Sequence, residues 1–334
     1  MKKINIIAEA GVNHNGKINL AKKLIKIAST AKADYIKFQF YKTNQLVSNH
    51  AKLAPYQKKS LKNSTSQLQL LKKYELSNSD IKYLLKYSKK KKIKFLCTPF
   101  DINSLKYLKS IGVNTFKIAS PDLDNFPLLY ALGKNLKKLF ISTGMSSLKE
   151  IGTTLEFLKK IKINKNKICL LHCVSDYPAK DSELNLNAIK LIAKKYNVEV
   201  GYSDHSIGEL ASIVAVALGA NVIEKHITLD KKMKGPDHTT SMNEKEFNNF
   251  VKKIRKTEIV MGKKLKKITK GESNNYKMIK RSVFLRRDVL KGQKFKISDF
   301  ICLRPRNIMK SIDWEKVIDK NSKRNYKKGE LIKI

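Results

Sequence analysis

The sequence has little proline or glycine and no long apolar run, and these shortages exclude whole classes of protein. Only 7 Pro and 14 Gly occur among 334 residues, which excludes collagen-like and low-complexity architectures. No run of about eighteen apolar residues is present, so we expect no membrane-spanning helix. The basic start MKKINIIAEAG is interrupted at Glu9 before an apolar signal segment can form. We therefore expect a cytoplasmic protein rather than a secreted one.

Cysteine is also scarce. The four cysteines are Cys97, Cys169, Cys173 and Cys302, which are too few and too scattered for a disulfide framework. Cys169 and Cys173 lie in one apolar run, ICLLHC, but no convincing further zinc ligands follow nearby. The sequence predicts reduced, buried cysteines, as in cytoplasmic proteins.

Acidic residues are few relative to basic ones. The chain has 28 Asp and Glu against 70 Lys and Arg, a net charge of +42. A polyanion-binding protein would explain this charge, and that function remains an alternative from a different class. However, the lysines are spread along the whole chain and are not interleaved with aromatic residues that could stack on bases. We interpret them as a solvated surface and expect no specific nucleic-acid partner.

What the sequence does contain is a regular alternation of short apolar runs and amphipathic segments. The apolar runs predict strands at 4–10, 35–40, 93–100, 115–120, 139–144, 168–174, 198–204 and 221–228. The amphipathic segments predict helices at 19–32, 80–92, 103–111, 148–161, 186–196, 209–218 and 243–261. Eight strands with following helices in about 260 residues are typical of a (β/α)8 TIM barrel. The first turn, GVNHNG, lacks the GxGxxG pattern of a doubly wound sheet.

Polar side chains stand where the predicted strands end, which is where barrel enzymes place their active sites. Because side chains on a strand alternate between faces, Lys37 shares a face with Gln39. In the same way Ser203 shares one with His205, and Glu224 shares one with His226. The strand ends carry Glu9, Lys37, Gln39, Thr98, Lys117, Ser120, Ser142, Thr143, Ser175, Ser203, Asp204, His205, Glu224 and His226. If the shared faces point inward, one mouth collects two histidines, two carboxylates, two lysines and several hydroxyls.

The residue types at this mouth suggest a chemistry. His205 and His226 end adjacent strands and could bind one divalent metal with open positions, although two hydrogen-bonded core histidines are the alternative. Lys37 and Lys117, with nearby serines, would suit a phosphate or carboxylate. Glu9 could act as a general base, support the metal or pair with a lysine, and so could Glu224.

A long polar segment, 42–67, lies between the second strand and the next predicted helix near Gln67. So long a connection is uncommon in a compact barrel and often functional. We expect it to form a loop over the mouth.

A series of motifs resembles one known family. The sequences IIAEAGVNHNG, IKFQF, FLCTPFD, FKIAS, ISTGMSS, LLHCVSDYPA, GYSDHSIG, VIEKHITLD and GPDH occur in this order, followed by RSVFLRRDVLKGQKFKISDFICLRPRN. Together they resemble the sialic acid synthases, a family that includes N-acetylneuraminate, legionaminate and pseudaminate synthases. The resemblance covers nearly the whole chain.

The resemblance implies a domain organisation. It implies a catalytic barrel over residues 1–262, a linker over 263–279 and a small C-terminal SAF (antifreeze-like, β-clip) domain over 280–334. It also implies a domain-swapped homodimer in which Arg304 reaches the sugar in the other subunit. The alternative for Arg304 is a surface arginine before a proline.

The resemblance also implies a reaction. Phosphoenolpyruvate would condense with an N-acyl mannosamine-type aldose to give a nine-carbon 2-keto-3-deoxy acid and phosphate, with cleavage of the C–O bond. Mn²⁺ or Mg²⁺ on His205 and His226 would polarise the aldehyde. The implied phosphoenolpyruvate contacts are Lys37, Lys117, Ser120, Ser142, Ser175 and Ser203. Those implied for the sugar are Gln39, Tyr177, Glu224, Asp237 and Arg304, and Glu9 would bind the sugar and take the proton of a water.

The acceptor sugar is the finer question. The pattern predicts an N-acetylneuraminate synthase, with a legionaminate or pseudaminate synthase that uses a 2,4-diacetamido-2,4,6-trideoxyhexose as the alternative. Ser175 stands where some N-acetylneuraminate synthases carry asparagine. The run FQFYKTNQLVSNHAKLAPYQ resembles the legionaminate branch and part of the neuraminate branch.

Overall fold

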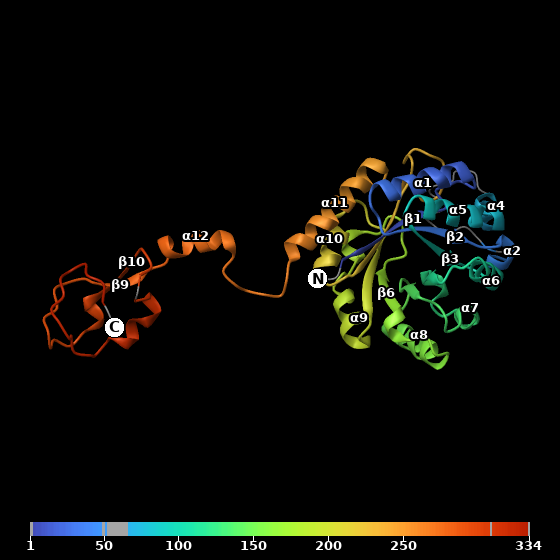
Figure 1. The fold of residues 1–334 in the computed structure, drawn as a ribbon. Helices are drawn as coiled ribbons and strands as arrows, with labels where there is room; N and C mark the ends of the chain where they lie inside the picture. The colour runs from blue at the N-terminus through green and yellow to red at the C-terminus, as the bar shows by residue number, and fades with distance from the viewer. Residues whose placement is uncertain (1–2, 49–50, 52–65, 308, 333–334) are drawn as a thin grey trace. The chain divides into compact units, whose positions relative to one another are not determined.

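A closed barrel of eight parallel strands forms the larger part of the chain. The computed structural model describes residues 3–48, 51, 66–307 and 309–332. The strands are β1 (Asn5–Gly11), β2 (Tyr35–Phe40), β3 (Lys94–Pro99), β4 (Thr115–Ile118), β5 (Lys138–Ser142), β6 (Ile168–Cys173), β7 (Glu199–Asp204) and β8 (Val222–His226). Each strand pairs with the next one in the sequence, and β1 pairs with β8 to close the ring (Figure 1). The predicted (β/α)8 fold is confirmed.

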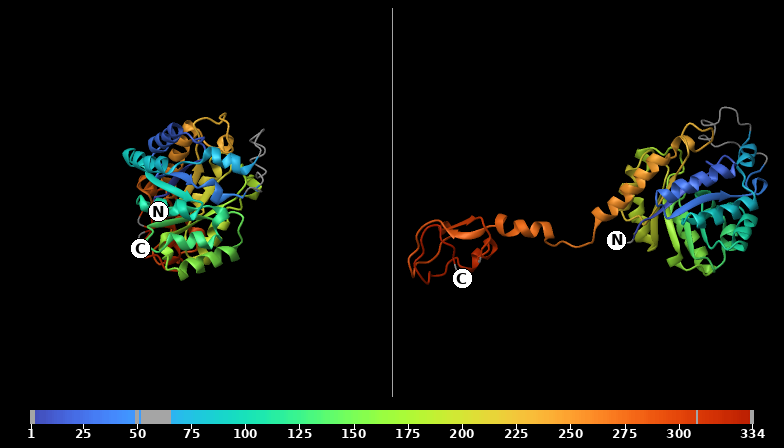
Figure 2. Two further views of the ribbon diagram at one scale, coloured as in Figure 1. Left: turned by 90° about the vertical axis from the view of Figure 1, so that its right-hand side faces the viewer. Right: turned by 45° about the horizontal axis from the view of Figure 1, so that its top comes forward.

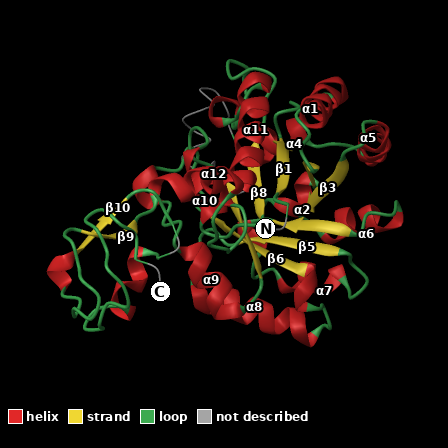
Figure 3. Cartoon of the chain, turned by 60° about the vertical axis from the view of Figure 1, so that its left-hand side comes forward, coloured by secondary structure: helices red, strands yellow, loops and turns green. Residues whose placement is uncertain are grey.

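Helices surround the strands, as Figures 2 and 3 show. They are α1 (Ile18–Thr30), α2 (Thr43–Leu46), α4 (Gln67–Tyr74), α5 (Asn78–Lys90), α6 (Ile102–Ser110), α7 (Phe126–Leu132), α8 (Leu148–Lys160), α9 (Ala188–Tyr196), α10 (Leu210–Ala217) and α11 (Glu244–Met261). Local sequence sets where several begin: Ser77, Ser147 and Asn243 each cap a helix in a capping box with an acidic residue three positions on. The buried faces of these helices pack on the outside of the strands.

The strand side chains that point inward form layers of different polarity. Near the amino ends, Ile7, Leu96, Phe140, Leu171 and Val222 belong to one buried apolar cluster. Two residues further along the same strands come polar side chains, such as Glu9 after Ile7 and Ser142 after Phe140. Because the strand period is two residues, the apolar layer closes the barrel beneath a polar layer at the carboxyl ends.

The sequence missed α7 and left one segment partly untested. α7 was not predicted because it is short and contains Pro127, which the first turn of a helix tolerates. In the segment predicted as a loop over the mouth, Thr43–Leu46 forms the short helix α2, and α4 begins at Gln67. Residues 49–50 and 52–65 lie outside the described residues, so the covering loop stays a prediction.

The rest of the chain forms a separate small unit, Lys263–Ile334. It contains the helix α12 (Lys270–Ile279) and an antiparallel pair, β9 (Ser282–Leu285) and β10 (Phe300–Leu303). The segment predicted as a linker is therefore partly helical. The unit has its own apolar core, formed by Val283, Leu285, Val289, Phe295, Met309, Val317, Tyr326 and Ile332.

Across the described ranges of both units, no helix is long and apolar enough to cross a membrane.

Candidate active site

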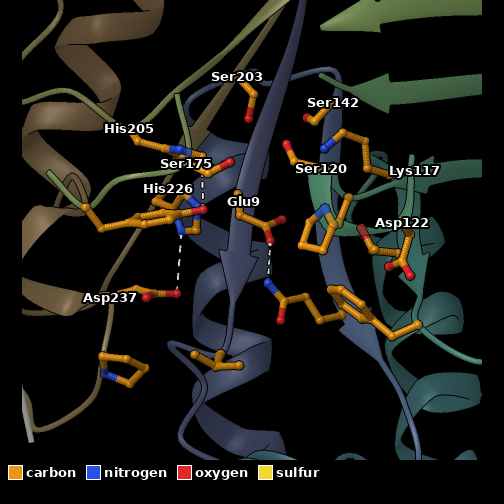
Figure 4. Close-up of a pocket in the computed structure, with 18 of the residues that line it drawn as sticks. Glu9, Lys117, Ser120, Asp122, Ser142, Ser175, Ser203, His205, His226 and Asp237 are labelled. Carbon is orange, nitrogen blue, oxygen red and sulfur yellow. Dashed lines mark hydrogen bonds and ion pairs between the residues drawn. The ribbon is translucent and has the colours of Figure 1, made fainter. Parts of the chain in front are cut away.

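A cavity of about 790 Å³ opens at the carboxyl ends of the strands. It is lined by side chains from every barrel strand or from the turn that follows it. The lining includes Glu9, Lys37, Gln39, Lys117, Ser120, Ser142, Ser175, Tyr177, Ser203, His205, Glu224, His226 and Asp237. Figure 4 shows Glu9 between the two histidines and the group formed by Lys117, Ser120 and Ser142.

Two lysines and two glutamates form a buried ion-pair network at the base of the cavity. Lys37 Nζ lies 3.0 Å from Glu9 Oε2 and 3.6 Å from Glu224 Oε1. Lys117 Nζ lies 3.3 Å from the same Glu224 oxygen. Ser203 donates to this oxygen at 3.0 Å, and Lys37 also reaches Thr98 Oγ1 at 3.2 Å. All four charged side chains are at most 5 % exposed, so their charges depend on one another rather than on water.

The two glutamates of this network differ in acidity. Burial raises the pKa of Glu9 to about 7, although Lys37 opposes the rise. Burial also acts on Glu224, but Lys117 and Lys37 together outweigh it and lower its pKa to about 2. Glu224 is therefore a fixed negative charge, whereas Glu9 can gain or lose a proton near neutral pH.

Hydroxyl groups gather beside Lys117. Ser120 Oγ accepts a hydrogen bond from the Gly144 amide at 3.0 Å. A side chain at Gly144 would collide with hydroxyls, because an added Cβ would lie 2.3 Å from Ser175 Oγ and 2.9 Å from Ser120 Oγ. The Ser142 hydroxyl is buried and has no hydrogen-bond partner. Glycine thus keeps open a space into which hydroxyls converge, and such a space suits the oxygens of an anion.

The two predicted metal ligands lie next to each other on the opposite side of Glu9. The ring centroids of His205 and His226 are 5.5 Å apart. His205 Nδ1 is 2.7 Å from the Val174 carbonyl, which makes Nδ1 the donor and leaves the Nε2 lone pair toward the Tyr177 hydroxyl, 3.0 Å away. His226 Nδ1 is buried without a hydrogen-bond partner, and Asp237 Oδ2 lies 3.9 Å from it. Burial and the neighbouring His205 lower the pKa of His226 well below its ordinary value.

These two imidazoles fit a divalent metal. One ring is oriented by a backbone carbonyl, as is usual for ligating histidines, and the other keeps an unsatisfied buried nitrogen. A neutral imidazole is the form that binds metal, and the lowered pKa of His226 favours it. No three His, Cys, Asp or Glu side chains in the described part of the chain are arranged to hold a metal together. Any metal here would therefore rely on ligands beyond the protein for its remaining positions.

Every residue predicted to contact a substrate or a metal, except Arg304, thus lines this one cavity. Arg304 belongs to the small unit, where it is exposed and followed by Pro305 across a cis peptide bond. Asp204, between Ser203 and His205 at the end of β7, points outward and pairs with Lys225 at 3.0 Å. It alternates with Ser203 and His205, so it cannot share their face.

Several lining residues were missed by the sequence. Asp122 and Asp176 line the cavity from the turns after β4 and β6, and each lies one or two residues beyond a serine that was predicted. Extending the prediction past the strand ends would have found them. Tyr41, Leu70 and Tyr74 also line it, but they come from the long segment after β2, where no periodic pattern pointed inward.

Comparison with known proteins gives consistent results. The model of the family described as "NeuB family" matches residues 24–266. An N,N'-diacetyllegionaminic acid synthase of Campylobacter jejuni is 44 % identical over 333 residues, which is 100 % of both chains. A protein of the same name from Legionella pneumophila is 41 % identical over 302 residues, covering 90 % of this chain and 85 % of that one.

A solved structure agrees with these sequence matches. The N-acetylneuraminic acid synthetase of Leptospira borgpetersenii, in complex with citrate, superposes with a TM-score of 0.73 at 37 % identity. The match covers 82 % of this chain and 90 % of that one.

Proposed function

The chain belongs to the NeuB family, and from this premise we propose that it is a nonulosonic acid synthase. It condenses phosphoenolpyruvate with an N-acylated aldose to give a nine-carbon 2-keto-3-deoxy acid and phosphate. One observation carries the proposal: a single cavity holds a cationic, hydroxyl-rich side at Lys37 and Lys117 and an imidazole side at His205 and His226, with Glu9 between them.

The cationic side receives phosphoenolpyruvate. Lys37 and Lys117 supply the charge, and Ser120, Ser142, Ser175 and Ser203 supply hydroxyl donors to its phosphate and carboxylate. Glu224 holds the two ammonium groups in place when the substrate is absent. Because the lysines are buried, their attraction to an incoming anion is little weakened by water.

The imidazole side receives the aldose, whose aldehyde must become electrophilic. We infer that Mn²⁺ or Mg²⁺ is held by His205 and His226, and that it supplies Lewis-acid polarisation of the aldehyde oxygen when bound. Tyr177, Asp237 and Gln39 line the same side and offer hydrogen bonds to the sugar. Gln39 Nε2 also donates to Glu9 Oε1 at 3.3 Å, so it orients that carboxylate.

Glu9 acts as the general base of the reaction. The C3 carbon of phosphoenolpyruvate bonds to the aldehyde carbon as its C2–C3 double bond opens, and the electrons of the aldehyde C=O bond move to its oxygen. A water then adds to C2, and Glu9 accepts one proton of this water and passes it to the former aldehyde oxygen, which becomes a hydroxyl group. The C2–O bond to phosphate breaks as the keto group forms, and the second proton of the water leaves with the phosphate. A pKa of about 7 suits a group that must be a base in one step and an acid in the next.

For the acceptor we propose a 2,4-diacetamido-2,4,6-trideoxyhexose, which would make the product a legionaminate-type acid. The full-length identity to the N,N'-diacetyllegionaminic acid synthase of C. jejuni supports this acceptor over the N-acetylmannosamine that the motifs alone predicted. N-acetylmannosamine remains the alternative, since the N-acetylneuraminic acid synthetase of L. borgpetersenii is 37 % identical.

We also propose that the protein acts as a domain-swapped homodimer in which the small unit is an SAF domain. The surface of α10 supports self-association. Its sequence, LASIVAVA, contains no charged residue in a chain of net charge +42. Leu210 and Val214 are exposed on this helix, and Ile207 is exposed in the loop before it. Such a surface could meet its own copy without repulsion between like charges.

The function is tested by phosphate release from phosphoenolpyruvate across three acceptors: N-acetylmannosamine, its 6-phosphate and the diacetamido-trideoxy sugar. We expect release only when an acceptor and Mn²⁺ or Mg²⁺ are both present, and fastest release with the third sugar. Absence of release with every acceptor and either metal would refute a synthase.

A further inference from the structure

An apolar wall lines a part of the cavity that has no role in the proposed reaction. We call the group Val12, Leu70, Leu71 and Tyr74 the α4 wall. Val12 follows β1, and the other three residues belong to α4, nearly 60 positions later. Val12, Leu70 and Tyr74 form a buried cluster of their own, separate from the barrel core, and are 2–6 % exposed. This cluster therefore shapes the cavity rather than supporting the barrel.

Specific contacts fix α4 in this place. The Tyr41 hydroxyl donates to the Leu71 carbonyl at 3.0 Å. Glu75, directly after the helix, accepts from the Thr43 amide at 3.1 Å and from its hydroxyl at 2.8 Å. A Cβ at Gly16 would lie 2.4 Å from the Lys73 carbonyl, so only glycine lets the first loop approach the helix this closely. The α4 wall is thus preformed.

The α4 wall adjoins the side of the cavity assigned to the sugar. A Cβ added at Gly11, the residue before Val12, would lie 3.4 Å from Glu9 Oε1 and 3.5 Å from the His226 ring. At the other end, burial and the nearby Asp237 carboxylate raise the pKa of Tyr74. An aldose whose aldehyde lies at the histidines would place its distal carbons along this wall.

The charges available in the cavity restrict what those distal carbons can carry. Among the described lining residues, the only lysines are Lys37 and Lys117, and none is an arginine. Both lysines are committed to the network with Glu9 and Glu224 and, on binding, to phosphoenolpyruvate. Against the described lining of the barrel, a phosphate on the sugar would meet an apolar surface without a counter-ion, which is strongly unfavourable.

We propose that the α4 wall selects the acceptor by packing against its apolar substituents, a C6 methyl and an N-acyl group, and by rejecting a 6-phosphate. This inference rests on the proposed synthase function and assigns Val12, Leu70 and Tyr74 as specificity-determining residues. The acceptor class it defines is an unphosphorylated, 6-deoxy, N-acylated aldose.

The test measures binding with acceptors that cannot react. Reducing the aldehyde to an alcohol gives the alditol of each sugar, and calorimetry in the presence of phosphoenolpyruvate and Mn²⁺ gives its Kd. We expect the alditol of the diacetamido-trideoxy sugar to bind best and that of N-acetylmannosamine 6-phosphate worst. Leu70→Ala removes methyl contacts and should raise the Kd of the alditol of the diacetamido-trideoxy sugar by about tenfold or more. The effect on the Kd of the N-acetylmannosamine alditol should be smaller.

A matched control lies on the same helix. Leu68 is half-buried but does not line the cavity, so Leu68→Ala should leave all Kd values unchanged. Val12→Ala provides an independent wall variant if Leu70→Ala unfolds. The proposal is overturned if the 6-phosphate alditol binds best, or if both wall variants weaken the alditols equally or not at all. If phosphate release failed while the alditols still bound as expected, the proposed synthase function would be refuted, but the role of the α4 wall in binding would not.

Discussion

Lys117 and Glu224 meet inside the barrel from opposite sides of the ring. Lys117 belongs to β4 and Glu224 to β8, 107 residues later, yet Lys117 Nζ lies 3.3 Å from Glu224 Oε1. Neither side chain is more than 4 % exposed. This ion pair crosses the interior at the level of the substrate cavity, so it links the closure of the barrel to the site that we propose for phosphoenolpyruvate.

Replacing one partner of this pair should destabilise the barrel strongly. Glu224→Leu leaves two buried ammonium groups with only Glu9 as a counter-charge, so we expect a loss of about 3–5 kcal/mol in the free energy of unfolding. Lys117→Met/Glu224→Leu removes both charges and should lose less than the single variant. Urea titration followed by circular dichroism measures both values.

An exposed pair provides the control for this comparison. Lys180 and Glu183 are 72 % and 51 % exposed, and Glu183→Gln should change the free energy of unfolding by less than about 1 kcal/mol. If the double variant were less stable than Glu224→Leu, the pair would be stabilising in itself, contrary to the argument from desolvation.

Removal of divalent metal should abolish phosphate release. Chelation with EDTA is expected to stop turnover, and Mn²⁺ or Mg²⁺ to restore it. His226→Ala should lower kcat by a factor of about 10³ or more, since Lewis-acid stabilisation contributes several kcal/mol. His172 is on the outer face of β6, bonded to the Leu184 carbonyl, so His172→Gln should keep its turnover. Full activity of His226→Ala in EDTA would remove the metal assignment.

Acid should weaken the fold through His14, which lies in the first loop beyond β1. Burial lowers its pKa from 6.5 to about 4 in the folded chain. Because the pKa of His14 is lower in the folded chain than in the unfolded chain, the unfolded chain binds a proton more readily between pH 6.5 and 4. The contribution of neutral His14 to stability is therefore complete above pH 6.5 and is lost as the pH falls toward 4. We expect the free energy of unfolding to fall over this range, and to fall less steeply in His14→Asn. An identical slope in both proteins would show that His14 does not contribute.

Mixed dimers test the domain swap. Arg304→Ala and His226→Ala should each be inactive, because one lacks the proposed sugar contact and the other a proposed metal ligand. If the small unit of one subunit completes the barrel of its partner, co-expressed variants form hybrids with one intact site. Statistical mixing then restores about a quarter of wild-type activity per total protein. No recovery, with hybrids verified by mass spectrometry, would contradict the swap.

The sequence predicted the barrel and most of its strand ends because these depend on local periodicity. Alternation along β2 and β8 placed Lys37 with Gln39 and Glu224 with His226, and all four line the cavity. Alternation along β7 likewise placed Ser203 with His205, and Asp204 between them faces outward and pairs with Lys225. α7 was missed because a short helix with Pro127 in its first turn has too few residues to show a period.

The sequence by itself, through its local periodicity, determined the ring of strands and the layer of polar groups above an apolar layer. It also determined the residue types available for chemistry. Tertiary structure alone decided which charges meet. Lys37 pairs with both Glu9 and Glu224, and the pKa values of these two glutamates shift in opposite directions. Leu70 and Tyr74 of α4 pack with Val12 and line the cavity, although they are far from it in the sequence. These relationships depend on distances across the closed barrel and on exclusion of water. Neither quantity is encoded by the spacing of residues along one strand or helix.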